Sequence, residues 1–470
     1  MKIKFLLCTY VMFLANFISS QTKSSATLRL EEYKSSENCD VTIPSENQDW
    51  NIEFETSNLL GDLAPNDYYT RRDPSSVLKI NGKYYVWYSY SITNGSGKIS
   101  PWDLNDLYYA TSEDGYTWKE EGIAIARGEE GSYDHRSAFT TEVFYYDKMF
   151  YLVYQASDTQ NNLNSGNTIA MAHANNPNGP WTKLSEPILH PSKEKSVAFD
   201  KFAVHDPCII RFKDKFYMYY KGEGNETPIC SYNTQIWGTS NKQVKWGVAI
   251  ADDIKGPYIK SEFNPITNTG HEVTVWKSGE GIGIMLHQDG PEYGTTQYAS
   301  DGLNFNIMGK VDFPLKQPWS STYPEAAGLY RPVTEEKSPV TGVSWGLSHV
   351  LNWGGTYGSW MYLKRFENKN KAAIVDDKNN QGIIIDSSLL IDKYKSKDVK
   401  HYPNPVLENL KIKGFKKGGL SIYDIKGVKL FKEEIDYDNS EVNLSHLSPG
   451  LYILKLIGSS INYTSQILKK

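Results

Sequence analysis

The chain has 470 residues, a net charge of −5 and 22% charged residues. This length is enough for more than one domain, and the slightly acidic balance provides no basic surface for nucleic acid. Aromatic residues are frequent, at 13% of the chain, with 33 Tyr and 12 Trp. Such a surplus is typical of stacked β-sheets and also of carbohydrate-binding surfaces, where flat rings pack against the C–H faces of sugars.

The first 20 residues have the pattern of a secretory signal peptide. Lys2 and Lys4 precede an apolar stretch, and small residues follow it at Ser19 and Ser20. The apolar stretch is too short and wrongly flanked for a membrane span. Residues 21–65 then form an N-terminal segment, in which the polar stretch TIPSENQDW is expected to be a loop.

Cysteine does not dominate this fold. Removal of Cys8 with the signal peptide leaves Cys39, Cys208 and Cys230, so at most one disulfide forms and one thiol is left over. Cys208 lies in an apolar strand pattern and is expected to be buried. The cysteine spacing is not that of a zinc site.

An aromatic phrase recurs through the centre of the chain. It reads NGKYYVWY up to Tyr88, YDKMFYLVY up to Tyr154 and KDKFYMYY up to Tyr220, at intervals of 66 residues. Each copy is a polar turn followed by a strand of period two, and each precedes a second turn-rich phrase such as ATSEDGYTW at 110–118. Repeated units of four strands are typical of β-propellers, whose blades bury their faces against their neighbours. Residues 66–370 are therefore predicted to be a five-bladed β-propeller in an all-β chain.

Acidic residues lie just upstream of the repeated phrases. The innermost strand of each blade lines the central channel, and its first residues lie at one mouth. The corresponding positions carry Asp73, Thr140 with Glu142, Asp206, His271 with Glu272, and Glu325. An isolated Asp-Pro is usually only a turn. Carboxylates at matching positions of several blades instead predict one site, because like charges held together shift each other's pKa at a cost in free energy.

A ring of acids in an aromatic funnel suits glycoside hydrolysis. In that reaction one group protonates the leaving oxygen and another activates water or attacks carbon. Calcium binding is the alternative, because oxygen-rich propeller axes can hold a metal ion. The pattern favours a hydrolase over a metal or lectin site. His271 is then either a structural histidine or a general acid whose pKa is influenced by Glu272.

Several longer motifs, in this order, resemble glycoside hydrolase family 117. The resemblance spans residues 48–368 and rests on WNIEFETSNLLGD (50–62), YYTRRDPSSV (68–77), SPWDLNDLYYATSEDGYTW (100–118), VHDP (204–207), ITNTGHEV (266–273), PEAAGL (324–329) and VSWGLSHVLNW (343–353). Members of that family are five-bladed propellers, typically exo-acting α-1,3-(3,6-anhydro)-L-galactosidases. The resemblance implies release of 3,6-anhydro-L-galactose from the non-reducing end of neoagaro-oligosaccharides, in agar degradation, with inversion of the anomeric centre.

The resemblance also implies roles for individual residues. Asp73 would be the general base that deprotonates the attacking water, Asp206 would stabilise the developing positive charge, and His271 would be the general acid. The surrounding carboxylates are expected to raise the pKa of His271 toward a useful value. The expected sugar contacts are Arg72, Trp102, Thr140, Gln155, Glu272 and Glu325.

The expected substrates are algal galactan oligosaccharides. The alternatives are a propeller glycosidase that acts on another algal or plant glycan, and a carbohydrate-binding propeller without catalysis. Residues 227–243 resemble an insertion beside the funnel, which would alter the sugars that fit. No cofactor and no metal ligand set is expected, with a divalent cation in the funnel as the alternative. Family members often dimerise through a longer helical N-terminal segment, so both a monomer and a homodimer are compatible with this sequence.

Residues 371–400 are predicted to be a linker and residues 401–470 a small β-sandwich. YPNP at 402–405, SIYDIKGVKL at 421–430 and LSPGLYILKL at 447–456 alternate apolar residues with Gly or Pro turns. Together these motifs resemble the C-terminal sorting domain of the type IX secretion system. The resemblance implies that the type IX secretion machinery is a partner, that the chain is secreted or reaches the cell surface, and that this domain is usually removed.

Overall fold

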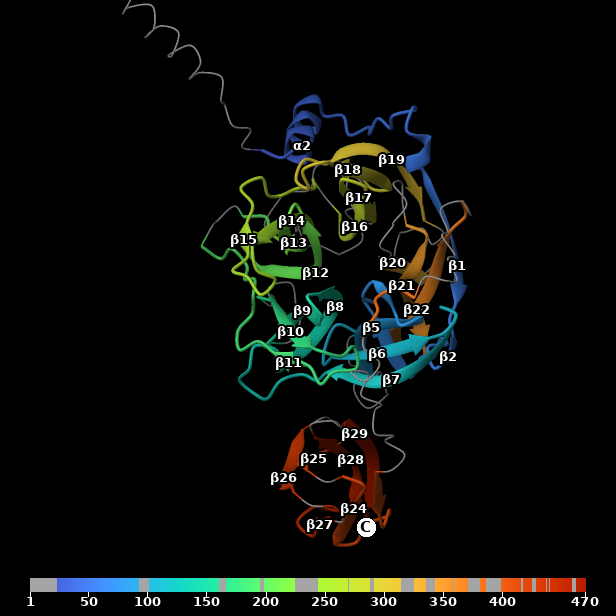
Figure 1. Cartoon of the computed structure of the whole chain (residues 1–470), viewed down its shortest axis with the longest axis vertical. Helices are drawn as coiled ribbons and strands as arrows, with labels where there is room; N and C mark the ends of the chain where they lie inside the picture. Colours follow the sequence, from blue (N-terminus) through green and yellow to red (C-terminus); the bar gives the residue numbers. More distant parts are fainter. Residues whose placement is uncertain are drawn as a thin grey trace, which may run out of the picture.

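The chain folds into a ring of five β-sheets and a small β-sandwich, coloured orange to red in Figure 1. This computed structural model describes residues 23–92, 101–159, 166–194, 198–224, 244–268, 270–287, 291–313, 325–334, 343–356, 358–370, 381–385, 399–415, 417–424, 428–436, 438, 440–458 and 462–470. The predicted signal peptide lies outside the described residues. The predicted all-β fold with a five-bladed propeller is confirmed.

Blades 1 to 3 each contain four antiparallel strands in chain order. Their strands are β4 (Val77–Ile80), β5 (Lys83–Ile92), β6 (Asp106–Ser112) and β7 (Thr117–Ile125) in blade 1, β8 (Ser137–Tyr146), β9 (Met149–Ser157), β10 (Thr168–Ala174) and β11 (Thr182–Lys183) in blade 2, and β12 (Ala203–Phe212), β13 (Lys215–Glu223), β14 (Val244–Ala251) and β15 (Ile259–Lys260) in blade 3. The short strands β2 (Leu60–Gly61) and β3 (Tyr69–Arg72) pair with β7 and β5. The three aromatic repeats lie on β5, β9 and β13, the second strand of each blade.

The last two blades close the ring. Blade 4 contains β16 (Glu272–Ser278), β17 (Gly281–His287), β18 (Thr295–Ala299) and β19 (Asn306–Asp312), and blade 5 contains β20 (Glu325–Thr334), β21 (Trp345–Gly355) and β22 (Gly358–Asn368). The fourth strand of blade 5 is β1 (Ile52–Asn58), which pairs antiparallel with β22 and parallel with β19. The N-terminal strand thus joins the two ends of the ring, and the propeller begins before the predicted residue 66.

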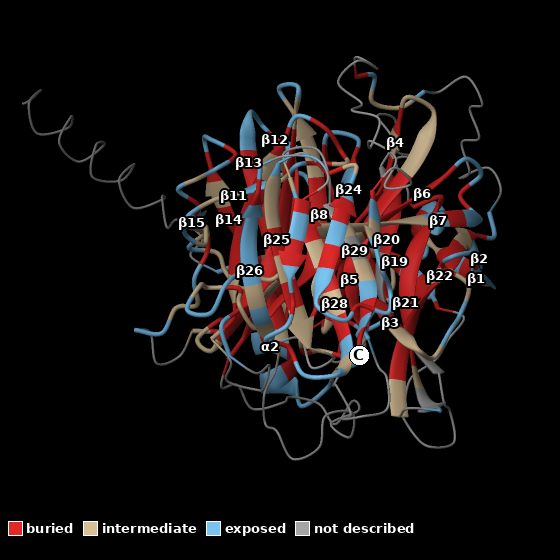
Figure 2. Cartoon of the chain, turned by 90° about the horizontal axis from the view of Figure 1, so that it is seen from below, coloured by how far each residue is buried: buried red, intermediate tan, exposed pale blue. Residues whose placement is uncertain are grey.

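The apolar core of the propeller lies between neighbouring blades. Alternate strand residues face opposite sides of a sheet, and each sheet is flanked by two others, so both faces are apolar. Trp87 and Tyr154 are fully buried in the cluster that joins blades 1 and 2, and Met218 and Tyr220 are fully buried in the next cluster. Figure 2 shows propeller strands such as β21 largely buried, whereas the sandwich strands β24 and β26 also carry exposed residues along their length.

Ion pairs of a buried aspartate with a partly exposed lysine, which we call the rim pairs, fasten the outer edges of blades 2 and 3. Each contains an aspartate between strands, a lysine on the outermost strand and a tyrosine on the second strand. The members are Asp134, Lys183 and Tyr154 in blade 2, and Asp200, Lys260 and Tyr220 in blade 3. In both blades the lysine Nζ lies 2.5 Å from the aspartate Oδ2, and the tyrosine hydroxyl donates to the same oxygen at 2.8 or 3.0 Å.

The N-terminal segment contains a helix that the strand patterns did not predict. The helix α2 (Ser25–Ser36) begins after Ser24, whose side chain accepts a hydrogen bond from a backbone N–H of the first turn. Arg29 anchors the helix to the propeller, because its Nε and Nη2 lie 2.6 and 3.0 Å from the two carboxylate oxygens of the fully buried Glu292. The rest of the segment up to β1 is loop apart from η1 (Gln48–Trp50), as expected.

The C-terminal residues form two small sheets around a core of their own. One contains β23 (Lys400–Tyr402), β24 (Asn409–Lys413) and β27 (Ser440–Asn443), and the other β25 (Gly418–Asp424), β26 (Lys429–Ile435), β28 (Gly450–Ile457) and β29 (Asn462–Lys469). Leu410, Ile422 and Leu454 are fully buried in this core. Within the predicted linker, Ile385 packs into the core cluster between blades 1 and 2, so this part of the linker belongs to the propeller.

The cysteines follow the expected pattern. Cys39 forms a disulfide whose partner lies outside the described residues, and Cys208 is a buried free thiol. Burial raises the pKa of the Cys208 thiol to about 12, so it stays protonated and unreactive. In the described part of the chain, no helix has the length and apolar character needed to cross a membrane.

Candidate active site

In each of the first three blades, the residue predicted at the mouth of the central channel has the same unusual backbone conformation. We call the region around these residues the axis. Asp73, Thr140 and Asp206 have φ angles of 47°, 43° and 49°, in the left-handed region that residues other than glycine seldom adopt. At Thr140 and Asp206 the pairing with the next strand contains one extra residue, which is a β-bulge. A bulge re-aims a side chain that would otherwise follow the alternation of the strand. The repeat therefore places these three residues equivalently, as their spacing predicts.

Asp73 is the most heavily bound carboxylate of the axis. Its Oδ2 accepts hydrogen bonds from the Thr140 hydroxyl, at 2.6 Å, and from Arg72 Nη1, and its Oδ1 lies 2.9 Å from His349 Nδ1. Burial alone would raise the pKa of Asp73, but the charge of Arg72 and the bonds from His349 and Thr140 outweigh burial and hold that pKa well below its usual value. Asp73 is therefore an ionised carboxylate at neutral pH.

Asp206 is paired with a lysine of the neighbouring strand. Lys221 on β13 places its Nζ 2.5 Å from Asp206 Oδ2, and both side chains are less than 10% exposed. Burial alone would lower the pKa of Lys221, but attraction to Asp206, Glu272 and Asp73 raises it above the ordinary value. Lys221 is thus a buried cation among three axial acids.

His271 and Glu272 lie at the start of blade 4, with His271 Nε2 at 3.5 Å from Glu272 Oε1. Burial, the charge of Lys221 and neighbouring imidazoles lower the pKa of His271 well below its ordinary value. Burial raises the pKa of Glu272 to about 8, and the negative charge of Asp206 adds to this effect. At neutral pH the pair therefore carries its proton on Glu272, next to a neutral His271.

The prediction that surrounding acids raise the pKa of His271 is wrong, and the reason is structural. That prediction considered the acids alone. The closed ring brings the buried cation Lys221 and the imidazoles of His205, His349 and His287 to the same place, so the field at His271 is not dominated by negative charge. Burial then disfavours the charged imidazole without compensation.

Among the other predicted sugar contacts, Arg72 and Thr140 bind Asp73, while Trp102 lies beside Arg72 and Gln155 beside His205. Arg72 Cζ lies 6.0 Å from the centroid of the Trp102 ring, and Arg72 Nη2 is buried without a hydrogen-bond partner among the described residues. Gln155 Nε2 lies 2.7 Å from His205 Nδ1. Thr140, as described above, donates to the predicted base. Glu325 begins strand β20, but its side chain lies outside the described residues.

Sequence reasoning missed several polar residues of the axis. They are His205, Lys221, Glu223, Arg331 and His349. His205 Nε2 lies 3.4 Å from Glu223 Oε2, and Arg331 Nη1 lies 3.4 Å from Glu142 Oε2. His205 directly precedes Asp206, and Lys221 and Glu223 directly follow the third aromatic repeat, so their positions in the repeat were a usable signal. Arg331 had no such signal, because only the closed ring brings blade 5 against blade 2, whereas His349 lies within VSWGLSHVLNW (343–353), a motif of the family resemblance.

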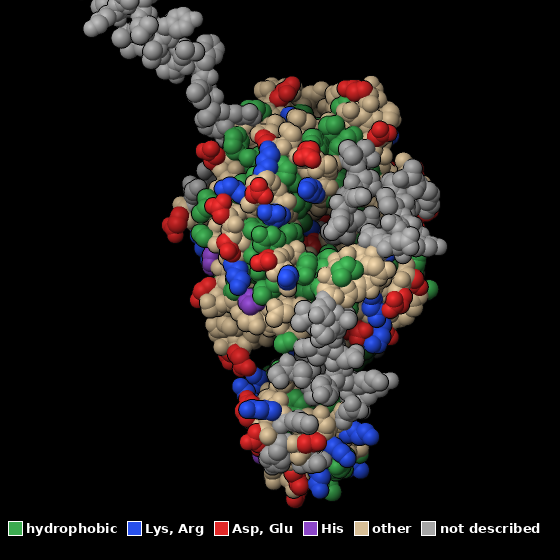
Figure 3. Space-filling model, viewed as in Figure 1, with side chains coloured by type: hydrophobic (Ala, Val, Ile, Leu, Met, Phe, Trp, Pro, Cys, Tyr) green, Lys and Arg blue, Asp and Glu red, His purple; other side chains and the backbone are tan. Residues whose placement is uncertain are grey.

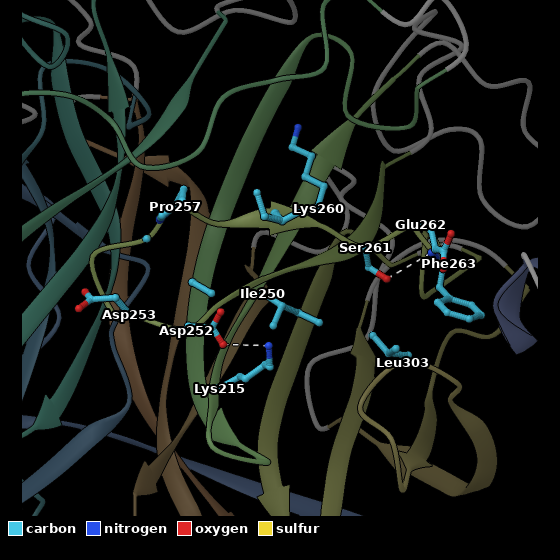
Figure 4. Close-up of a pocket in the computed structure, with 13 residues that line it drawn as sticks. Lys215, Ile250, Asp252, Asp253, Pro257, Lys260, Ser261, Glu262, Phe263 and Leu303 are labelled. Atoms are coloured by element: carbon cyan, nitrogen blue, oxygen red, sulfur yellow. Dashed lines mark hydrogen bonds and ion pairs between the residues drawn. The ribbon is translucent and has the colours of Figure 1, made fainter.

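A groove of about 690 Å³ lies between blade 3 and Leu303 of blade 4 (Figure 4). Residues of β14, β15 and the following loop line it, among them Ile250, Ile259 and Phe263, and Lys215 and Asp252 form an ion pair of 2.8 Å at its edge. None of the axial acids contributes to the lining. The groove is therefore separate from the candidate active site.

Charge balance also bears on metal binding. Within the described ranges, no group of three or more His, Cys, Asp or Glu side chains could hold a metal ion. At the axis, Lys221 and Arg72 occupy positions beside carboxylate oxygens that a hard cation would need as ligands.

On the face of the molecule in Figure 3, acidic and basic side chains are interspersed over the propeller.

Comparison with a solved structure shows the family. The chain resembles Zg3597, a family 117 glycoside hydrolase produced by the marine bacterium Zobellia galactanivorans, with 31% identity and a TM-score of 0.56 over 73% of this chain and 97% of that one. The chain belongs to glycoside hydrolase family 117. The predicted family is therefore confirmed, and this family 117 chain is a propeller glycoside hydrolase.

The chain also matches other glycoside hydrolases, with lower sequence identity. Residues 63–251 match the model of the glycosyl hydrolases family 32 N-terminal domain. The GH43_1 enzyme from Xanthomonas citri complexed with xylotriose shares 12% identity, with a TM-score of 0.41 over 67% of this chain and 89% of that one. The GH32 β-fructofuranosidase BmSUC1 of Bombyx mori shares 14% identity, with a TM-score of 0.41 over 94% and 93%. No curated protein matches the chain.

The C-terminal sandwich is also assigned by comparison. Residues 400–470 match the secretion system C-terminal sorting domain, and this range agrees with the sandwich of strands β23 to β29. The family 117 hydrolase therefore uses the type IX secretion machinery and is secreted or reaches the cell surface, as predicted.

Proposed function

We propose that this family 117 hydrolase is an exo-acting α-1,3-(3,6-anhydro)-L-galactosidase of agar degradation, which releases 3,6-anhydro-L-galactose from the non-reducing end of neoagaro-oligosaccharides. The observation that carries this proposal is the convergence of three groups on one stretch of the axis. They are the ionised Asp73, the Asp206–Lys221 ion pair and the His271–Glu272 pair. Together they provide the proton acceptor and the proton donor that inverting glycoside hydrolysis requires, and a carboxylate that can stabilise developing positive charge.

Asp73 is the general base in this mechanism. It is ionised at neutral pH and held at both oxygens, so it accepts a proton from a water molecule while the water oxygen attacks the anomeric carbon. Attack on the face opposite the leaving group inverts the anomeric centre. Asp206 places negative charge near the oxocarbenium-like transition state, and its ion pair with Lys221 holds the carboxylate in position.

The His271–Glu272 pair supplies the proton to the leaving oxygen. Glu272, with its pKa raised to about 8, holds a proton at neutral pH. His271 is the more exposed member, with 21% of its side chain accessible against 9% for Glu272, and therefore faces the sugar. Glu272 passes its proton to His271 Nε2 while the proton on Nδ1 moves to the glycosidic oxygen. The imidazole ends neutral and Glu272 ends ionised.

Proton NMR with neoagarobiose and neoagarotetraose tests this function. The purified mature chain should release 3,6-anhydro-L-galactose from both, and the first anomer observed should be the inverted one. Absence of release by a folded protein would contradict the proposed substrate. A panel of other algal and plant oligosaccharides would then separate a glycosidase of another glycan, which hydrolyses one of them, from a binding propeller, which binds without hydrolysis.

A further inference from the structure

His349 is a buried histidine of the axis that the proposed mechanism does not use. It lies on β21 in blade 5, and its side chain is 5% exposed. Its Nδ1 lies 2.9 Å from Asp73 Oδ1, and the backbone N–H of Asp73 points at the same nitrogen at 3.2 Å. Asp73 follows β3 in blade 1, so this contact connects the first and last blades of the ring.

The contacts of Nδ1 determine where its proton lies. An imidazole nitrogen either donates or accepts in the plane of the ring, and it cannot do both at once. A lone pair directed at an ionised carboxylate oxygen 2.9 Å away would be repelled, whereas an N–H is attracted to it. The shorter contact is also the one to the charged group. The ionised carboxylate therefore favours the tautomer with the proton on Nδ1, which donates to Asp73 Oδ1 at the expense of the contact from the backbone N–H.

We propose that His349 is the positioning residue of the general base: it holds Oδ1 of Asp73 while Thr140 and Arg72 hold Oδ2. This inference rests on the proposed role of Asp73. Donors on both oxygens fix the rotation of the carboxylate about its Cβ–Cγ bond and leave the remaining lone pair of Oδ1 for a water molecule. A base held in this way needs no reorientation at the moment of attack.

The charged and titratable groups around Asp73 come from several packed elements. They are Arg72 beside it, His349 from β21, Lys221 from β13 and Glu272 from β16. Burial alone raises the pKa of Asp73, and the donors and cations oppose that effect. Loss of the His349 donor leaves burial opposed by fewer groups. The pKa of Asp73 then rises, and the acid limb of the activity profile moves to higher pH.

Two substitutions at His349 separate positioning from packing. In His349→Asn the amide Nδ2 can take the place of the imidazole Nδ1 as a donor, whereas His349→Leu has no donor. With neoagarobiose as substrate, His349→Leu should lower kcat ~100-fold with little change in KM. The acid limb of its pH–activity profile should move up by about one pH unit or more. His349→Asn should recover most of kcat, and the acid limb of its profile should stay where it is in the wild type.

Ser348→Ala is the matched control on the same strand. The Ser348 hydroxyl is buried without a hydrogen-bond partner among the described residues, so its removal should leave both the rate and the pH profile unchanged. An acid limb of His349→Leu that coincides with that of the wild type would overturn the proposal. An equal loss of kcat in the Leu and Asn variants would also overturn it, because a packing role predicts that result.

A measurement without substrate keeps the two proposals distinguishable. If the wild-type chain hydrolyses none of the oligosaccharides, the proposed function fails, and the pairing is judged by NMR of the chain labelled with ¹⁵N-histidine, which contains nine histidines. The His349 signals, assigned by their loss in His349→Asn, should show a protonated Nδ1 whose proton moves upfield in Asp73→Asn. An unprotonated Nδ1 would overturn the proposal.

Discussion

The rim pairs and the axial acids are two sets of buried carboxylates with the same sequence repeat and different surroundings. Asp134 and Asp200 at the rim are 66 residues apart, as are the ring positions of Thr140 and Asp206. Each rim aspartate takes one lysine and one tyrosine at a single oxygen. The axis instead brings together acids, cations and imidazoles from different blades, and Arg72 Nη2 has no hydrogen-bond partner among the described residues.

This difference shows what marks a site in a repeat protein. A buried acid that recurs in successive blades is not sufficient evidence of a functional site, because the rim pairs recur as well and only fasten the blades. The distinguishing features of the axis are several titratable groups within each other's field and polar atoms left without a partner. The following substitutions test that distinction.

The largest expected effect is that of Asp73→Asn compared with Asp134→Asn. Asn at position 73 keeps the shape of the base but cannot accept a proton, so kcat should fall ~1000-fold or more. Asn at position 134 leaves Lys183 without its counter-charge, so the Tm should fall while kcat of the folded protein stays within about twofold. Initial rates and thermal unfolding measure both. A similar loss of kcat in the two variants would contradict the distinction between axis and rim.

The second prediction concerns pH and Glu272. Because the pKa of Glu272 is about 8, kcat/KM of the wild type should fall as the pH rises through that value. Glu272→Gln cannot ionise, so its rate should be lower at every pH and this alkaline limb should disappear. Asp200→Asn at the rim should keep the wild-type limb. If the decrease of kcat/KM at about pH 8 remained in Glu272→Gln, the titrating group would be another residue.

The same shift has a consequence for stability. The pKa of Glu272 is raised in the folded protein above its ordinary value of 4.5, so the folded state binds the proton more tightly than the unfolded state. The tighter proton binding by Glu272 therefore contributes to the stability of the folded protein. This contribution is fully present below the pKa that Glu272 has in the unfolded chain, and it is lost as the pH rises through about 8. Chemical denaturation of Glu272→Gln should therefore show a weaker decline of stability across that window than the wild type.

The smallest expected effect is that of Tyr220→Phe at the rim. The substitution removes the hydroxyl that donates to Asp200 at 3.0 Å and accepts from Asn264 Nδ2 at 3.3 Å, while Lys260 remains in place. The free energy of unfolding should fall by about 1 to 2 kcal/mol, since a hydrogen bond usually contributes about 1 kcal/mol and the second contact is long. Urea denaturation measures this change, and the pH profile of activity should stay that of the wild type. A displaced profile would mean that the rim pair also influences the axis.

The repeat made much of the fold predictable. A polar turn followed by a period-two aromatic strand occurs at 66-residue intervals, and these strands are β5, β9 and β13. The acids predicted at the axis, Asp73 and Asp206, share the same left-handed backbone, because equivalent places in a repeat have equivalent conformations. The strand β1 was not predicted as part of a blade, since its pattern does not reveal that its partner is β22, about 300 residues away.

The sequence by itself determined the local patterns of this protein: the strands, the turns, the number of blades, the C-terminal sandwich and the identity of the axial acids. These follow from the period of the side chains and from spacing along the chain. Only the tertiary structure decided the closure of the ring by β1, the pairing of Asp73 with His349, and the proton distribution between His271 and Glu272. The physical reason is that burial and charge depend on every neighbour in space, and these neighbours, such as Lys221 and Arg331, come from different blades.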